Sequence, residues 1–448
     1  MKPRLLFLFP EGWDDIARAS VPALRDECDT VTEGFDLFRF PQNARLLWFD
    51  ARGWVDRLAQ RFRRRGLAGV LSTHEQYGAL IAALLAQRLG LPGTDPAAIV
   101  RAQHKFHARE LLAAAVPDAN PRFRLLPYTF DATDVAASEP GFPYPFFVKP
   151  VKAAFSVLAR RVDSAAALQR HLTFQPWERH IIKRLVHPFA ALMRSVPGVT
   201  VDPAHMLAEG VIDGVQINVD GWVDRGKADV FGVVDSVMYP GTQAFLRFDY
   251  PSRIPPAAQD AACEVALRAI RALGFDHGAF NVELCWDPAT NRLQIVEVNP
   301  RFAAQFGDLY EKVDGDSPYR VLADLAVGRT PAWRRRCGRH GVASSFVFRE
   351  FDGAVKIAPE RAAIRWLADR YPDAHLQTFI KRGNSRSREM KWLGSYRYAI
   401  VNLGGRDVAD LERRYRDVCD HVSFDPAVPR IGVGVGVGGS IDAMRPRR

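Results

Sequence analysis

The chain has 448 residues, which is too many for one compact hydrophobic core and predicts about two to four domains. Its 48% hydrophobic and 25% charged residues are typical of a water-soluble globular protein. The formal net charge of +10 is compatible with an anionic small molecule, nucleic acid or a membrane surface, and equally with arginines spread over solvated faces.

The cysteines and the apolar runs indicate the cellular compartment in which the protein is expected. Five cysteines are scattered with no CxxC spacing, so neither a disulfide framework nor a zinc ribbon is indicated. The N-terminal apolar run, residues 5–9, is too short for a signal peptide. No apolar run approaches the ~18 residues that a membrane helix needs. We therefore expect a cytoplasmic protein in a reducing compartment, with no membrane partner.

Residues 1–95 alternate short apolar strands with helices. Strands are expected at residues 5–9 and 68–71, followed by an apolar helix at residues 76–89. This alternation favours a small parallel sheet, which we interpret as a first α/β domain.

Residues 96–330 are expected to form a larger α+β domain. Helices are expected at residues 97–116, 164–172 and 255–273, and strands at residues 142–149, 206–212, 215–223, 227–237, 279–286 and 292–300. The dipeptide Asp213-Gly214 lies between two of these strands and predicts a hairpin turn there.

The C-terminal residues are expected to form an α+β lid region over residues 331–430. Its strands are expected near residues 343–349, 375–380 and 397–403, and its helices near residues 359–368 and 407–418. The Gly-rich residues 431–448 are expected to be a disordered tail. No GxxxxGK[ST] motif follows a strand, which excludes a P-loop.

The strands at residues 279–286 and 292–300 carry the most informative pattern. Alternation puts Glu283 on one face of its strand and Glu297 with Asn299 on one face of the next. A hairpin centred on the turn between them places Glu283 opposite Glu297. Two opposed carboxylates repel unless a divalent cation lies between them, and Mg²⁺ prefers carboxylate oxygens and substrate phosphates. The alternative is a solvent-facing hairpin with exposed acids.

The order of these pieces along the chain resembles the ATP-grasp superfamily, in particular its carboxylate–amine ligases and biotin-carboxylase-like members. The matching motifs are HKFHAREL, FFVKPVKAAFS, MLAEGVIDGVQINVDG, FNVEL and IVEVNPR. The resemblance runs from about residue 68 to residue 328. It implies an ATP-grasp fold in which the nucleotide lies between two lobes, preceded by the small parallel-sheet domain and closed by the C-terminal lid.

The resemblance also implies roles for individual residues. It predicts Mg²⁺ or Mn²⁺ on Glu283, Glu297 and Asn299, and catalysis by Arg301 and Lys149. It predicts that ATP contacts a set of lysines, hinge residues and polar side chains: Lys105, Lys149, Lys152, Ser156, Glu209, Gly210, Val211, Ile212 and Gln216. Arg247 and His277 are weaker candidates for substrate contacts, each with a purely structural role as the alternative.

Three departures from the family pattern stand out. Residues 152–156 read KAAFS, where glycines are usual, and alanine restricts backbone conformations that glycine allows. Gln216 stands where an acid often contacts ribose, although its amide can also bind a hydroxyl group. Phe302, Ala303 and Ala304 replace a common glycine pair.

The function expected from these residues is Mg-ATP-dependent ligation of a carboxylate to an amine through an acyl phosphate, with release of ADP and phosphate. The alternatives are a biotin-carboxylase-like carboxylase and a nucleotide-binding module that has lost catalysis. Small-molecule acids and amines are the expected partners, and homodimer formation stays open. Basic runs at residues 334–340 and 381–391 lack interleaved aromatic residues, so we expect no nucleic-acid partner.

Overall fold

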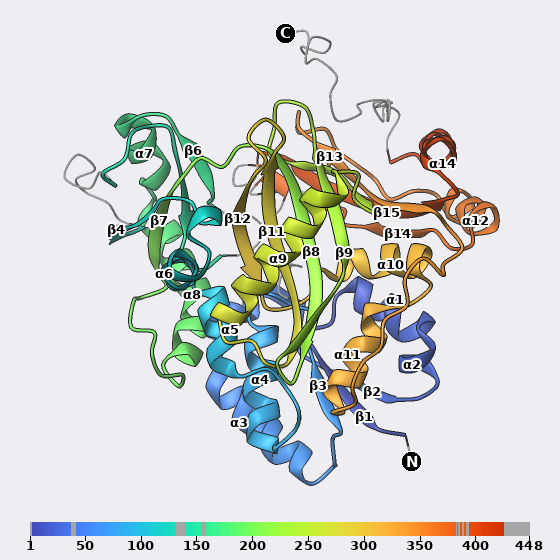
Figure 1. Ribbon diagram of the computed structural model, residues 1–448, viewed down its shortest axis with the longest axis horizontal. Helices are drawn as coiled ribbons and strands as arrows, with labels where there is room; N and C mark the ends of the chain where they lie inside the picture. Colours follow the sequence, from blue (N-terminus) through green and yellow to red (C-terminus); the bar gives the residue numbers. More distant parts are fainter. Residues whose placement is uncertain are drawn as a thin grey trace.

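The computed structural model describes residues 2–36, 42–130, 140–153, 158–381, 383, 386, 387, 389, 390 and 394–424, without the side chains of residues 43 and 47. These residues form three sheets surrounded by helices (Figure 1). The expected tail at residues 431–448 lies outside the described residues. Within the described part, no helix combines the length and the apolar character needed to cross a membrane.

The N-terminal residues form a three-stranded parallel sheet in the order β2-β1-β3, as the alternating pattern predicts. Its strands are β1 (Arg4–Leu8), β2 (Asp29–Glu33) and β3 (Gly69–Leu71). Its helices are α1 (Gly12–Ser20), α2 (Pro22–Arg25), α3 (Ala51–Arg63) and α4 (Gly78–Leu89). Side chains alternate across β1: Leu6 and Leu8 join the core beneath α3 and α4, while Leu5 and Phe7 join the core on the other face.

A four-stranded antiparallel sheet follows, in the order β4-β7-β5-β6. Its strands are β4 (Phe123–Thr129), β5 (Phe146–Pro150), β6 (Arg160–Val162) and β7 (His205–Gly210). The helices α7 (Ala165–Leu172) and α8 (Pro176–Met193) contribute to its core. Ser164 caps α7 by accepting a hydrogen bond from Ala167 N, as its position before the apolar run predicts.

The largest sheet has eight strands in the order β12-β11-β8-β9-β10-β13-β15-β14. Its strands are β8 (Val215–Asp224), β9 (Lys227–Met238), β10 (Phe245–Tyr250), β11 (Gly278–Asp287), β12 (Arg292–Asn299), β13 (Val342–Glu350), β14 (His375–Thr378) and β15 (Tyr396–Gly405). Its helices are α9 (Pro256–Ala272), α10 (Gly307–Asp314), α11 (Pro318–Ala326), α12 (Arg361–Arg370) and α14 (Val408–His421). Because β13 pairs with β10, this sheet runs without a break across residue 331, the predicted start of the lid region. The division at residues 95, 330 and 430 stays a prediction.

The expected helix at residues 97–116 is wrong, because two helices occupy this range. α5 (Pro96–Gln103) ends and α6 (Lys105–Ala115) begins at His104, whose backbone leaves the helical region. The imidazole Nδ1 of His104 accepts a hydrogen bond from His107 N and so caps α6. Lys105 is therefore the first residue of its helix.

The hairpin predicted at Asp213-Gly214 is also wrong. The strand before it, β7, belongs to the four-stranded sheet, and the strand after it, β8, belongs to the eight-stranded sheet. Gly214 has a φ of +121°, and a Cβ there would lie 2.5 Å from the carbonyl oxygen of Trp286. The glycine is thus needed for a close crossing between sheets and not for a turn.

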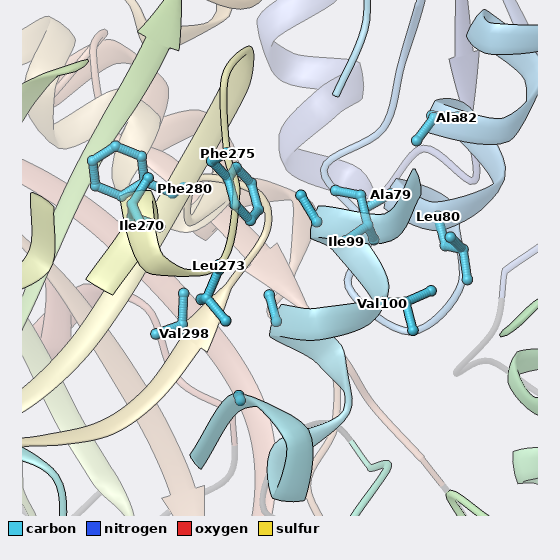
Figure 2. Close-up of a cluster of buried hydrophobic side chains, with 14 of the residues drawn as sticks. Ala79, Leu80, Ala82, Ile99, Val100, Ile270, Leu273, Phe275, Phe280 and Val298 are labelled. Atoms are coloured by element: carbon cyan, nitrogen blue, oxygen red, sulfur yellow. The ribbon is translucent and has the colours of Figure 1, made fainter. Parts of the chain in front are cut away.

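One continuous core joins the N-terminal helices to the large sheet (Figure 2). Leu273 at the end of α9, Phe280 on β11, Ile99 of α5 and Val298 of β12 belong to this core, and Figure 2 shows Leu273 beside Val298. These side chains are almost completely buried. The packing fixes β11 and β12 against α5 and α9, so it also fixes the opposite face of that hairpin.

Replacing Leu273 with alanine is expected to lower the free energy of unfolding by about 2–5 kcal/mol, because the side chain is fully buried and leaves a cavity. The urea and thermal midpoints of the variant measure this loss. Ile364→Ala, at a position that is 45% exposed, is the matched control and should change the midpoints little. Equal midpoints for the two variants would contradict the packing described.

Candidate functional site

A cleft of about 2350 Å³ lies where the three sheets meet. Residues from β5, β8, β9, β11, β12, β13 and β15 line it, together with residues of the N-terminal domain after β1 and β3. Its walls combine apolar side chains such as Phe147 and Leu185 with a group of buried acids, lysines and arginines. A concave site with a few convergent charged groups is typical of a small-molecule site.

Glu283 and Glu297 lie directly opposite each other on β11 and β12, as predicted. A β-bulge at this point produces the register, because Leu284 pairs with Ile295 and leaves Val296 without a partner on β11. Glu283 accepts hydrogen bonds from Gln216 Nε2 at 2.9 Å and from Asn299 Nδ2 at 3.1 Å. Burial, followed by the charge of Glu297, raises the pKa of Glu283 above its ordinary value.

Lys105 supplies the cation closest to this pair. Its Nζ lies 2.7 Å from Glu297 Oε1 and donates a hydrogen bond to the carbonyl oxygen of Ala153 at 2.7 Å. Burial acts to lower the pKa of Lys105, but Glu297 and Glu75 together raise it above its ordinary value. The ammonium group therefore stays charged beside the carboxylates.

Lys149 belongs to a second buried network that links the two antiparallel sheets. Its Nζ lies 2.8 Å from Glu209 Oε2, and Arg109 Nε lies 2.7 Å from Glu209 Oε1. Lys149 and Arg109 also donate to the carbonyl oxygen of the bulged Val296, at 3.2 and 2.8 Å. β12 is an edge strand, so its outward carbonyl groups are free to accept these bonds.

Lys152 is 3% exposed and lies 5.0 Å from the centre of the Phe189 ring. Burial lowers the pKa of Lys152 to about 7, and Lys105 adds to this effect while Glu75 opposes it. A lysine that is partly neutral near pH 7 gains most from an anionic ligand, because the ligand restores its charge.

Arg301 forms an ion pair with Glu75, a residue that the sequence reasoning missed. Glu75 follows β3 in the N-terminal domain, 226 residues away in the chain. Burial acts to raise the pKa of Glu75, but Arg301, Lys152 and Lys105 outweigh it and lower that pKa. Nothing local in the sequence marks Glu75, because its partner comes from another sheet.

The acidic pair fits a divalent cation that completes its shell with phosphate and water. Within the described ranges, no group of three or more His, Cys, Asp or Glu side chains is placed to hold a metal. The chain would thus supply two carboxylates and the amide of Asn299, whose nitrogen now faces Glu283 and would turn to present its oxygen. Few protein ligands are typical of a Mg²⁺ ion that is bound mainly through phosphates and water.

A family model for the ATP-grasp domain matches residues 142–308. The chain contains an ATP-grasp domain. This agrees with the predicted family, and the parallel N-terminal sheet and the two antiparallel sheets confirm the predicted mixture of α/β and α+β structure.

Three known proteins show how far the similarity extends. Carnosine synthase 1 of Gallus gallus is 31% identical over 292 residues, which are 62% of this chain and 29% of that synthase. An L-amino acid ligase structure from Bacillus licheniformis superposes with a TM-score of 0.68 at 16% identity, covering 94% of this chain and 98% of that one. The structure of carboxyaminoimidazole ribonucleotide synthase from Aspergillus clavatus complexed with ATP superposes with a TM-score of 0.64 at 15% identity, covering 93% and 98%. The two structures support the ATP-grasp fold across nearly the whole chain.

The ATP-grasp cleft brings together most of the residues expected to contact nucleotide. Gly210, Val211 and Ile212 line it at the crossing between sheets. The side chain of Glu209 instead lies beneath the cleft, paired with Lys149 and Arg109. Ser156 lies outside the described residues.

The two weaker substrate candidates, Arg247 and His277, line different cavities. Arg247 lines the cleft and donates to both carboxylate oxygens of Asp249, at 3.0 and 2.9 Å. His277 borders a separate small cavity, and its Nε2 lies 3.0 Å from the carbonyl oxygen of Leu325. His277 directly precedes β11 and does not line the cleft, so its position supports the structural role.

Replacing Glu209 with glutamine is expected to lower the free energy of unfolding at pH 7 by about 3–5 kcal/mol, because two buried cations lose their carboxylate. Burial acts to raise the pKa of Glu209, but Arg109 and Lys149 lower it to about 2, from an ordinary 4.5. The stabilisation is therefore complete above pH 4.5 and is lost as the pH falls towards 2. Urea unfolding at several pH values should show the difference between the two proteins shrinking over that range.

The exposed Glu27→Gln serves as the control and should match the parent chain at every pH. A Glu209→Gln variant as stable as the parent at pH 7 would contradict the buried network.

Proposed function

We propose that this protein is a Mg-ATP-dependent ligase that activates a carboxylate as an acyl phosphate and joins it to an amine. The observation that carries the proposal is the partly buried, opposed pair Glu283 and Glu297 within reach of Lys105, Lys152 and Arg301. Opposed carboxylates that are partly removed from water destabilise a protein by themselves, so this pair argues for a site that a cation completes.

The lysines provide the phosphate-binding part of the proposed site. Lys105 at the start of α6 and the two lysines at the end of β5, Lys149 and Lys152, all lie near enough to Glu297 for its charge to act on them. The ammonium groups of Lys105 and Lys152 would meet the phosphate chain of ATP, while Lys149 is positioned by Glu209 and Val296. Gly210, Val211 and Ile212 would bind adenine through backbone groups, and Gln216 would contact ribose while holding Glu283.

Mg²⁺ or Mn²⁺ held by Glu283, Glu297 and Asn299 would neutralise phosphate charge during the transfer. Arg301 lies beside the acidic pair, and its charge can stabilise the oxygens of the transferring phosphoryl group. Glu75 holds the guanidinium in place until the phosphate competes for it.

The proposed reaction has two balanced steps. An oxygen of the substrate carboxylate attacks the γ-phosphorus, the bond to the β-phosphate oxygen breaks, and ADP leaves. The amine nitrogen then attacks the acyl carbon, phosphate leaves with the bonding electrons, and the amine loses a proton. Positioning and charge neutralisation suffice for both steps, so no protein nucleophile is needed.

The names of the relatives favour ligation over the alternatives. The carnosine synthase and the L-amino acid ligase both carry names that denote joining of small molecules, and the chain spans only 29% of that synthase. Retention of Lys149, Glu283, Glu297 and Arg301 argues against a module that has lost catalysis. A carboxylase remains the rival reaction, with bicarbonate as the activated acid. We further propose small-molecule acid and amine substrates, a cytoplasmic location and three domains divided near residues 95 and 330.

The first test is the release of ADP and phosphate from Mg-ATP with pooled amino acids and other carboxylates. Release should depend on a pool and fall by at least about 1,000-fold in Glu297→Gln, because a metal ligand is removed. The exposed Glu264→Gln should keep the activity of the parent chain. Full activity in Glu297→Gln would overturn the metal assignment, and release that requires bicarbonate alone would favour the carboxylase.

Nucleotide binding at pH 8 should take up about one proton per site, because the pKa of Lys152 rises from about 7 when phosphate approaches its ammonium group. Affinity should therefore fall as the pH rises above 7. Calorimetry in buffers with different ionisation enthalpies measures this uptake. It should disappear in Lys152→Met and persist in Lys227→Met, at an exposed position. Equal uptake in both variants would show that another group titrates.

A further inference from the structure

A second pair of like charges lies across neighbouring strands of the large sheet. Arg349 of β13 is directly opposite Arg397 of β15. Both residues line the cleft that also contains Glu283, Glu297 and Arg301. Like charges placed opposite each other destabilise a sheet, so this pair requires compensation by negative charge.

The described residues provide little of that compensation. Arg349 Nη1 donates to Ser395 Oγ at 2.9 Å, while its buried Nε has no hydrogen-bond partner in the part of the chain that the structure describes. The Arg397 guanidinium lies over the Phe379 ring, 4.3 Å from its centre. Burial, followed by the charge of Arg397, lowers the pKa of Arg349 to about 10.

Glu389, the acid whose charge acts most on both arginines, already has other partners. Glu389 is the one acid in the sequence between residues 381 and 394. One oxygen of its carboxylate forms an ion pair with Lys381 Nζ, and the other accepts a hydrogen bond from the backbone N of Arg397 at 3.3 Å. Within the described part of the chain, Arg349 therefore keeps an unpaired N–H donor, and both arginines line the cleft.

Glu11 interacts electrostatically with both the arginine pair and the proposed reaction centre. It lines the cleft at the start of α1, and the charges of both Arg397 and Arg301 act on its carboxylate. A carboxylate in the cleft that feels the charges of Arg397 and Arg301 is suited to an ammonium group. A substrate that carries both an amine and an anionic group would thus find a partner for each.

We infer that Arg349 and Arg397 form an oxyanion subsite for a carboxylate or phosphate group on the amine-bearing substrate. The inference rests on the proposed function and narrows its amine to a compound with its own anionic group, such as an amino acid. Guanidinium groups bind both kinds of oxyanion through paired N–H donors. The activated carboxylate lies instead at the acidic pair, where ATP is held.

The test uses binding of matched probes to the full chain loaded with Mg²⁺ and a non-hydrolysable ATP analogue. Amino acids are compared with their amides, and phosphoethanolamine is compared with ethanolamine, by thermal shift and equilibrium dialysis. An anionic probe should bind the parent chain about 10- to 100-fold more tightly than its neutral counterpart, as expected for a charged hydrogen-bonded pair. Preference for the amino acid assigns a carboxylate, and preference for phosphoethanolamine assigns a phosphate.

Arg349→Ala and Arg397→Ala should each abolish this preference and leave stabilisation by nucleotide unchanged, while Arg397→Lys should recover part of it. The control Arg361→Ala removes an exposed arginine of α12 and should keep the preference. If an alanine variant fails to fold, Arg349→Gln and Arg397→Gln replace it, because they keep more of the side-chain volume.

The inference is overturned if anionic and neutral probes bind the parent chain equally, or if the arginine variants keep the preference. This binding test does not depend on whether the protein catalyses the ligase reaction. A chain that binds anionic probes through these arginines but releases no ADP with any pool would count against the ligase reaction and leave the subsite standing.

Discussion

The repulsion between two partly buried carboxylates, Glu283 and Glu297, is the constraint around which the cleft is organised. The hairpin of β11 and β12 holds them opposite each other because its other face is locked into the core by Val282, Leu284 and Val298. The bulge at Val296 is essential to this arrangement. Without it, Glu283 would face Val296, and one carboxylate would point to the opposite side of the sheet. Cations must then gather around the pair, and the chain supplies them from the start of α6, from the end of β5 and from the residues after β12.

The network below the cleft determines where these cations lie. Glu209 neutralises Arg109 and Lys149 at once, and the carbonyl oxygens at the edge of β12 accept their remaining bonds. One buried acid thus joins the four-stranded sheet to the eight-stranded sheet. The same contacts hold Lys149 and the crossing at residues 211–214 in a constant relation to the acidic pair. Stability and function depend on one set of ion pairs here, so substitutions at Glu209 affect both.

The C-terminal strands also place two like charges opposite each other, but this pair is basic. β13 and β15 extend the large sheet and place Arg349 opposite Arg397 on the wall of the cleft. An acidic pair that needs a cation and a basic pair that needs an anion therefore occupy the same cleft. Such a distribution suits a substrate with separated charges, and it depends on the last strands joining the central sheet.

The sequence by itself determined which side chains share a face, because strand alternation is a local property. Glu283, Glu297, Asn299 and the lysine motifs followed from that alternation and from the order of the motifs along the chain. Only the tertiary structure decided which strands pair. It assigned β7 and β8 to different sheets despite Asp213-Gly214, and it broke a continuous helical pattern at His104. It also brought Glu75 to Arg301 and Arg349 to Arg397. Local periodicity carries no information about such distant partners, since these contacts form only when the sheets and the N-terminal domain pack together.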